Sequence, residues 1–231
     1  IMPQRDPRVE GFQISAMSRP ALEVGGDFYD FFWFDEPRGR LAILLGDVSG
    51  KGLRAAMTAA MASGMIRAGT LAGESVGEVL TRINAPLKSK IERDVFVAAL
   101  LMILDTASKA LVFTNAGLIR PILLSGGSAT QLRSEGVPFP LGMNLSFVYR
   151  EQRMQLASGD TLVLMSDGIP EAHDPDRRLY GQERLLELLT GLSGQRLSAG
   201  EIRDRILADV AAFVGPADQH DDITLLVLRV L

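Results

Sequence analysis

The sequence contains no cysteine and only two histidines, His173 and His220. Without cysteine, a disulfide scaffold, a thiolate metal site and a cysteine nucleophile are all excluded. Two histidines are also too few for a three-histidine metal site. Thiolate and three-histidine metal centres, and covalent catalysis by a thiol, are therefore excluded for this protein.

Long apolar runs and an excess of basic residues are missing as well. The longest uninterrupted apolar run, residues 95–104, is about half of the roughly 20 residues that a membrane helix needs. Lys and Arg total 24 against 28 Asp and Glu, which counts against a nucleic-acid partner. No basic-then-apolar signal segment opens the chain. We therefore expect a cytoplasmic location, with no membrane insertion and no nucleic-acid binding.

The composition that remains is that of a globular protein. The chain has 231 residues, of which 47% are hydrophobic and 23% charged, enough for a substantial buried core. No repeat, low-complexity stretch or long charge run divides it. The first residues carry two prolines and no periodicity, and Ile1 precedes the first Met. We therefore predict a linker from an upstream region over residues 1–9 and a single domain over residues 10–231.

The hydrophobic patterns predict runs of strands interrupted by pairs of helices. One helix is expected from Leu53, with an apolar stripe at Ala56, Met57, Ala60, Met61 and Met65 that we interpret as core packing. A second begins at the capping box of Ser75 and Glu78, with a stripe to Ile91 and a kink at Pro86. Two more are expected over residues 181–190 and 198–214, the latter opening with a capping box of Ser198 and Glu201. Strands are expected over residues 10–18, 28–34, 41–47, 95–104, 110–114, 120–124, 147–156, 161–166 and 222–230.

This order of elements favours an α+β fold with largely antiparallel sheets. The strict strand–helix–strand alternation of a parallel, Rossmann-like sheet is missing. The last strand is apolar on both faces, which predicts a central position in its sheet.

Aspartates stand at the ends of four apolar strands, each beside small residues. They occur in Gly25-Gly26-Asp27, Gly46-Asp47-Val48-Ser49-Gly50, Ser166-Asp167-Gly168 and Asp221-Asp222-Ile223-Thr224. A single Asp followed by Gly is usually a turn residue. Four carboxylates at the ends of buried strands repel one another if they converge, and a hard divalent cation relieves that repulsion. Structural turns and a carboxylate metal cluster both remain open at this stage.

The ordered motifs resemble those of the metal-dependent (PPM, type 2C-like) serine/threonine phosphatases. The match is closest to the bacterial subgroup of RsbU and sporulation stage II protein E, and it spans residues 10 to 230. The motifs are Glu23-Val24-Gly25-Gly26-Asp27-Phe28-Tyr29-Asp30, Gly46-Asp47-Val48-Ser49-Gly50-Lys51-Gly52, Asn115-Ala116-Gly117, Ser166-Asp167-Gly168 and Asp221-Asp222-Ile223-Thr224. Each motif alone is weak, whereas all five in this order and spacing are specific.

The resemblance implies a four-layer α-β-β-α sandwich of two mainly antiparallel sheets flanked by helix pairs. It further implies two bound Mn²⁺ or Mg²⁺ ions. Asp47 would bridge both ions and the carbonyl of Val48 would bind one of them. Asp27 would serve the second ion, while Asp167 and Asp221 would complete the first, with Asp222 as the alternative to Asp221. The catalytic set is accordingly Asp27, Asp47, Asp167 and Asp221, and the reaction is hydrolysis by metal-activated water without a covalent intermediate.

Four further basic residues lie in or near the motifs. Lys51 stands where many family members carry a histidine, and it is either a phosphate contact or a solvated lysine at a helix start. Arg19 either steers phosphate or lies on the surface. His220 is a candidate for orienting a ligand of the metal centre, and His173 is expected to be a solvated loop residue.

The leading functional hypothesis is a phosphatase acting on phosphoserine or phosphothreonine of a regulatory partner, by resemblance an anti-sigma-factor antagonist. An upstream sensor domain or an activator protein is the expected further partner. The alternative is a catalytically weak or inactive phosphatase-like signalling module, but every expected metal ligand is present. The motif of an aspartyl-phosphate phosphatase is Asp-x-Asp after a strand. This chain has Asp47-Val48-Ser49 instead, which disfavours that class of enzyme. The acidic balance disfavours a carboxylate-metal nuclease.

Overall fold

The computed structural model describes residues 2–33, 39–133 and 138–231, and the chain divides into two compact units. Unit 1 comprises Ile1–Arg5, Leu22–Leu118 and Arg133–Leu156, and unit 2 comprises Asp6–Ala21, Ile119–Leu132 and Ala157–Leu231. That residues 10–231 form a single domain after a linker over residues 1–9 stays a prediction. Each unit is described below by itself.

Unit 1 is a five-stranded antiparallel sheet with two helices. The strand order is β2-β3-β4-β5-β8, so the long apolar strands β3 and β4 are central. The bounds are β2 Phe28–Trp33, β3 Arg40–Val48, β4 Val97–Asp105, β5 Ala110–Ala116, β8 Gln152–Gln155, α1 Leu53–Leu71 and α2 Val76–Lys88. The last residue of the strand expected over residues 28–34 lies outside the described residues.

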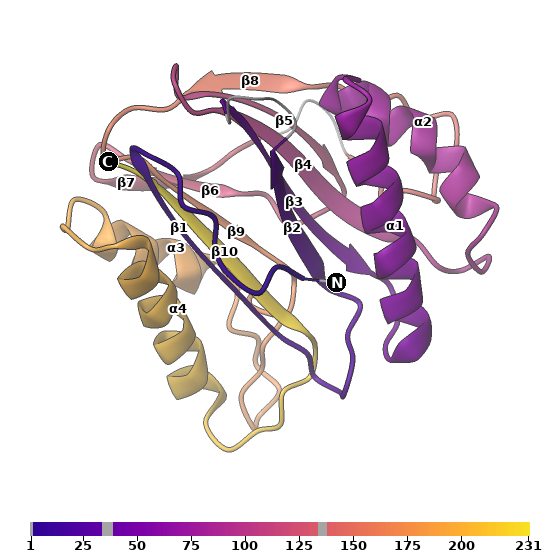
Figure 1. The fold of residues 1–231 in the computed structure, drawn as a ribbon. Helices are drawn as coiled ribbons and strands as arrows, with labels where there is room; N and C mark the ends of the chain where they lie inside the picture. Colours follow the sequence, from indigo (N-terminus) through magenta and orange to yellow (C-terminus); the bar gives the residue numbers. More distant parts are fainter. Residues whose placement is uncertain (1, 34–38, 134–137) are drawn as a thin grey trace. The chain divides into compact units, whose positions relative to one another are not determined.

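Helices α1 and α2 lie side by side and pack on this sheet (Figure 1). The stripe predicted for α1 is wrong in phase, because the buried residues are Ala55, Ala59, Ala62 and Ile66 instead. Met57 is 65% exposed, whereas Met61 and Met65 are partly buried against the core. Apolar residues occur on every side of α1, so their spacing cannot tell which face is buried.

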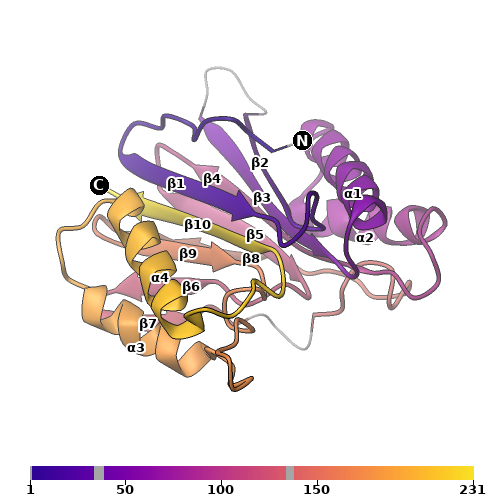
Figure 2. The same ribbon diagram turned by 90° about the horizontal axis from the view of Figure 1, so that it is seen from below.

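Unit 2 is a second five-stranded antiparallel sheet with its own helix pair. The strand order is β1-β10-β9-β6-β7, and α4 packs on β1 and β10 while α3 packs on β7 (Figure 2). The bounds are β1 Phe12–Arg19, β6 Ile122–Ser125, β7 Ser128–Gln131, β9 Thr161–Met165, α3 Gln182–Leu192, α4 Ala199–Val214 and β10 Ile223–Val230. β10 has a strand on either side and is almost wholly buried, which confirms its predicted interior position.

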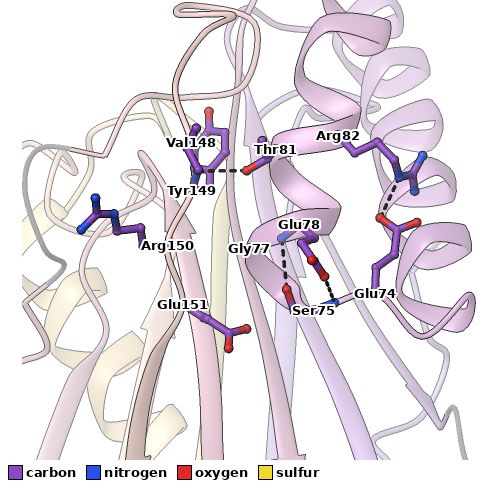
Figure 3. Close-up of a pocket in the computed structure, with 10 residues that line it drawn as sticks. All are labelled: Glu74, Ser75, Gly77, Glu78, Thr81, Arg82, Val148, Tyr149, Arg150 and Glu151. Carbon is purple, nitrogen blue, oxygen red and sulfur yellow. Dashed lines mark hydrogen bonds and ion pairs between the residues drawn. The ribbon is translucent and has the colours of Figure 1, made fainter.

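Both predicted capping boxes are present. At α2 the Ser75 side chain accepts a hydrogen bond from the Glu78 backbone N–H, and the Glu78 side chain accepts one from the Ser75 N–H (Figure 3). Ser198 and Glu201 make the same exchange at the start of α4. α2 continues through Pro86 and ends at Lys88, so Ile91 lies beyond the helix.

Two strand predictions differ from the structure. The strand expected over residues 147–156 is confined to β8, because the Tyr149 N–H donates to the Thr81 hydroxyl of α2 instead of to a strand (Figure 3). The short polar strand β7 was not expected. Its signal was present in Gly126-Gly127, where both residues have positive φ angles and form a two-residue hairpin turn.

Two antiparallel sheets, each with a helix pair, confirm the predicted α+β class. In the part of the chain that the structure describes, no helix is both long and apolar enough to cross a membrane.

Candidate metal centre

Two predicted ligands of unit 1 stand at the same end of one strand pair. β2 pairs with β3 so that Phe28 lies opposite Gly46, where the ladder ends. Continuing this register by one step places Asp27 opposite Asp47, in agreement with the close approach of Gly26 to the Val48 carbonyl. Residues opposite one another on antiparallel strands have Cβ atoms about 5 Å apart, and like charges there are destabilising. Asp27 is only 3% exposed and Asp47 is partly exposed. The register thus creates a carboxylate pair that a cation would stabilise.

Glycine makes this pairing possible at two positions. A Cβ atom on Gly26 would lie 2.6 Å from the carbonyl oxygen of Val48 and 3.3 Å from the Ala55 side chain. A Cβ atom on Gly46 would run into the Phe28 ring. The backbone before Asp27 therefore packs directly against the backbone after Asp47. This packing places the Val48 carbonyl oxygen beside Gly26, the residue next to Asp27.

The segment that follows Asp47 is held at both of its ends. Val48 pairs with Val97 as the last step of the β3–β4 ladder. The Ser49 N–H donates to the Phe96 carbonyl at 3.1 Å, and the Ser49 hydroxyl accepts from the Phe96 N–H at 3.0 Å. α1 begins at Leu53, directly after Gly52, whose φ angle is 77°. The position of α1 and that of Asp47 are thus linked through a few fixed residues.

Unit 2 brings Asp167 and the Asp221-Asp222 pair together at the ends of neighbouring strands. The Ser166 N–H donates to the Thr224 carbonyl, and the Thr224 N–H donates to the Ser166 hydroxyl, both at 3.0 Å. A Cβ atom on Gly168 would clash with the Asp222 carbonyl. The residue after Asp167 must therefore be glycine for the two segments to approach this closely.

The environment of Asp167 favours its protonated form. Burial, followed by the charges of Glu171 and Asp221, raises the pKa of the Asp167 carboxyl from 3.8 to about 6. A carboxyl whose charge is disfavoured by burial and by neighbouring acids gains most from a bound cation.

The two adjacent aspartates differ in their surroundings. Asp222 is 8% exposed, and its Oδ1 accepts a hydrogen bond of 2.8 Å from the Ala21 N–H at the end of β1. Asp221 is more exposed, and its charge is the one that acts on Asp167. Both carboxylates thus accept a backbone N–H, since the Asp221 Oδ1 accepts one from Asp222 at 2.9 Å, but only the charge of Asp221 acts on Asp167.

Arg19 and Lys51 differ in how they are held. The Arg19 Nε donates to the Gln219 side chain at 2.7 Å, and Gln219 donates to the carbonyls of Arg19 and Asp221 at 2.9 and 2.8 Å. Gln219 thus links Arg19 to the Asp221 segment. No motif in the sequence predicts this role of Gln219. Lys51 is exposed at the start of α1.

The remaining motif, Asn115-Ala116-Gly117, closes a turn. The Asn115 side chain accepts from the Leu118 N–H at 2.8 Å and donates to the Leu118 carbonyl at 3.0 Å. His173 departs from the expected solvated residue, because its Nε2 atom is buried. His220 is exposed, next in sequence to Asp221.

The donor set of both units consists of oxygen atoms. Carboxylate and carbonyl oxygens are the ligands that Mg²⁺ and Mn²⁺ prefer, so the chemistry of these residues fits the ions that the resemblance implies. Across residues 2–33, 39–133 and 138–231, no three His, Asp or Glu side chains are gathered closely enough to hold a metal ion. The structure places the predicted ligands as two sets, Asp27, Asp47 and Val48 in unit 1 and Asp167, Asp221 and Asp222 in unit 2.

Comparison with known families identifies the chain. Residues 37–231 match the model of the family "Stage II sporulation protein E (SpoIIE)". The chain belongs to the SpoIIE family. Its likeness to the RsbU/SpoIIE subgroup of PPM phosphatases is thereby confirmed.

Curated relatives agree with this family. Protein IcfG of Synechocystis is 25% identical over 98% of this chain, and the phosphoserine phosphatase RsbU of Bacillus subtilis is 26% identical over 96% of it. The SpoIIE-family chain spans 39% of the length of IcfG and 64% of that of RsbU.

Solved structures share the fold. The PP2C phosphatase domain of SpoIIE from Bacillus subtilis, solved with a fragment of its regulatory domain, superposes with a TM-score of 0.80 at 21% identity. That match covers 97% of this chain and 64% of the SpoIIE chain. RsbX in complex with magnesium superposes with a TM-score of 0.69 at 17% identity, covering 97% of this chain and 98% of RsbX. The fold is accordingly that of the PP2C-type phosphatases.

Proposed function

We propose that this chain is a metal-dependent phosphatase that hydrolyses phosphoserine or phosphothreonine on a regulatory partner protein in the cytoplasm. One observation carries the proposal: the β2–β3 register sets Asp27 opposite Asp47 at the end of a buried strand, in a chain of the SpoIIE family. A pair of opposed carboxylates destabilises a metal-free protein. Carboxylates held in such an unfavourable arrangement are candidates for a functional site.

We assign the metal ligands as follows. Asp47 would serve both ions, the Val48 carbonyl would bind one of them, Asp27 would serve the second, and Asp167 and Asp221 would serve the first. The close approach of Gly26 to the Val48 carbonyl supports the part of Val48. The raised pKa of Asp167, caused by burial and then by Glu171 and Asp221, supports that of Asp167 and Asp221. Asp222 is left to hold the Ala21 N–H.

The ions themselves are proposed to be Mn²⁺ or Mg²⁺. The all-oxygen donor set favours these hard cations over Zn²⁺. The magnesium in the RsbX structure, which has the same fold, supports this choice. When bound, two such ions activate a water molecule and neutralise the phosphoryl oxygens.

The residues of the chain then do three things. The carboxylates of Asp27, Asp47, Asp167 and Asp221 would hold the ions, and Ser49 fixes the segment after Asp47 through its two hydrogen bonds to Phe96. Arg19, tethered by Gln219 to the Asp221 segment, can meet a phosphoryl anion. In the proposed reaction the phosphoryl group passes directly to water, the bond to the serine or threonine oxygen of the partner breaks, and that oxygen leaves as a hydroxyl after taking up a proton.

The substrate class is proposed from the relatives. RsbU is a phosphoserine phosphatase by name, and the subgroup resemblance points to a phosphorylated anti-sigma-factor antagonist as the partner. An upstream sensor domain or an activator protein is the proposed source of control.

The test is hydrolysis of p-nitrophenyl phosphate and of a phosphoserine peptide with Mn²⁺, with Mg²⁺ and after exhaustive chelation. Turnover is expected with either ion and none after chelation, with recovery when the ion is restored. Full activity in the presence of chelator would overturn the metal-dependent mechanism. Hydrolysis of neither substrate with any ion would favour the alternative of a phosphatase-like signalling module.

A further inference from the structure

The only two histidines of the chain lie together in unit 2. His173 is in the loop that follows β9, and His220 is in the segment that precedes β10. Their ring centres are 5.3 Å apart, and the ring planes are inclined at 46°. The fold therefore brings both imidazoles of the protein to one place from distant parts of the sequence.

The hydrogen bonding of His173 leaves one ring nitrogen ready to act as a ligand. Its Nδ1 lies 3.2 Å from the carbonyl oxygen of Asp174. A carbonyl oxygen only accepts, so Nδ1 is the donor, and in the neutral imidazole Nε2 is then the nitrogen with the lone pair. Nε2 is buried and has no hydrogen-bond partner among the described residues. Metal-binding histidines characteristically show this arrangement, with the non-ligating N–H donated to a backbone carbonyl.

The spacing of the rings fits a shared ion. Imidazole nitrogens bind Zn²⁺ at distances of about 2.0–2.1 Å. When two imidazoles bind one tetrahedral ion, this distance places the centres of their rings roughly 5 Å apart. The inclined planes also differ from a parallel stack, in which the rings would only touch face to face.

Space for further ligands is present beside the pair. Both histidines line a cavity of 340 Å³ that also includes Arg19 and Gln219. Both also line a second cavity of 320 Å³, whose walls include Asp174 and Asp218. Water or a small anion can therefore complete the coordination of an ion held by the two rings.

We propose that His173 and His220 form a two-imidazole site for a late first-row divalent ion of the Zn²⁺, Ni²⁺ or Cu²⁺ type. Imidazole suits these ions, whereas Mg²⁺ and Mn²⁺ prefer oxygen. The remaining coordination positions belong to solvent, since no third His, Asp or Glu joins the pair within the described residues. An ion held there ties the loop after β9 to the segment before β10. The site is distinct from the carboxylate set and does not rest on the proposed phosphatase activity.

The experiment titrates Zn²⁺ into the 231-residue chain in the presence of excess Mg²⁺ and follows the imidazole nitrogens by NMR. Because the chain has two histidines, the spectrum contains two ring systems and needs little assignment. Both rings are expected to shift together and to saturate at one equivalent of Zn²⁺. A response of one ring only, or saturation of the two at different Zn²⁺ concentrations, would overturn a shared site.

Variants complete the test. His173→Gln and His220→Gln should each weaken Zn²⁺ binding at this site by at least about tenfold. His220 is exposed, so we expect His220→Gln to fold, and this variant tests the site even if His173→Gln does not fold. Asp47→Asn, in the carboxylate set of unit 1, should leave the Zn²⁺ response of both rings unchanged. Unaltered affinity in His220→Gln would refute the proposal, as would loss of the ring response in Asp47→Asn.

Discussion

Asp47 is the residue on which the proposed metal site depends most. It stands opposite Asp27 at the end of the β2–β3 ladder, with the Val48 carbonyl beside Gly26. Strand register accounts for this placement, because Asp27 and Asp47 adjoin the last pair of the ladder, Phe28 and Gly46. A cation bound between the two carboxylates would lower the repulsion between their charges.

We expect Asp47→Asn to lower turnover by at least about 100-fold, since it removes the charge proposed to be shared by two ions. The metal-free variant should unfold at the same or a higher temperature than the original chain, because like-charge repulsion falls. Phosphate release and thermal unfolding measure the two effects. Asp30→Asn is the matched control on β2, where Asp30 is engaged by Arg67 at 2.7 Å, and it should keep turnover within about threefold. An active Asp47→Asn enzyme would move the site elsewhere.

The contacts of Asp221 and Asp222 predict different roles for the two residues, which the sequence alone does not distinguish. Asp221→Asn should weaken Mn²⁺ binding by at least about tenfold with little change in stability. Asp222→Ala should instead destabilise the fold by about 1–3 kcal/mol, because it leaves the Ala21 N–H without its acceptor. Mn²⁺ titration and denaturant unfolding of both variants provide the measurements. The reverse pattern, with metal affinity lost in Asp222→Ala and kept in Asp221→Asn, would exchange the two roles.

Asp167 gives the metal-free protein a defined pH dependence. Burial, then Glu171 and Asp221, raises the pKa of its carboxyl to about 6 in the folded state, against 3.8 when unfolded. The folded state therefore holds the proton more tightly. The contribution of this group to stability is complete below pH 4 and is lost as the pH rises through 6. Allowing for solvent screening, the change is about 1–2 kcal/mol.

Unfolding of the metal-free chain between pH 4 and 7 tests this contribution. Asp167→Asn should flatten the dependence over that interval, because it removes the titrating group. Mn²⁺ affinity should fall as the pH drops below 6, since the ion and the proton compete for the same carboxyl. A dependence that is identical in the original chain and in Asp167→Asn would show that other groups cause it.

Close packing between elements places the Val48 carbonyl, and Gly26 is the residue that permits it. We expect Gly26→Ala to push this carbonyl away, lowering Mn²⁺ affinity and destabilising the fold by about 1–3 kcal/mol. Gly64→Ala is the matched control, because a Cβ atom at Gly64 in α1 meets nothing within 4 Å. That variant should be stabilising by about 0.5–1 kcal/mol. Equal metal affinity in both variants would argue against a part for the Val48 carbonyl.

The elements also show what a sequence can and cannot specify. Ser75 with Glu78 and Ser198 with Glu201 marked two helix starts, because a capping box is a local exchange of hydrogen bonds. The buried face of α1 was missed, because a helix that is apolar all round has no phase to read. Residues 147–151 look like a strand, yet their backbone meets a side chain of α2, a partner 68 positions away.

The same limit applies to the candidate site. Motif order was enough to select Asp27, Asp47, Asp167 and the Asp221-Asp222 pair. The choice within that pair depends on Ala21, and the tether of Arg19 depends on Gln219, both contacts across 200 or more positions. The approach of His173 to His220 likewise follows from the turn after β9 and from the residues that lead into β10. Contacts of this kind are decided by tertiary packing, which a single sequence does not display.

At the scale of the whole molecule, the question is whether the metal ligands are held ready or must be brought into place. α1 begins at Leu53, five positions after Val48, and α2 packs beside it, so a shift of this helix pair would carry the Asp47 segment with it. Metal sites need their ligands within a few tenths of an ångström. The chain spans 39% of IcfG and 64% of RsbU, so both relatives contain segments beyond the part that matches.

We therefore expect the 231-residue chain to be a weak phosphatase whose activity rises at least about tenfold when an upstream segment or an activator protein is added. The physical reason is that a contact on α1 or α2 that stabilises the productive position of Asp47 raises metal affinity and turnover together. Mn²⁺ affinity and kcat on a phosphoprotein, measured with and without the added segment, are the observables. Parallel increases in both support control through the helix pair. Equal values at full phosphatase speed would instead mean that the ligands are already in place and that α1 and α2 serve only as packing.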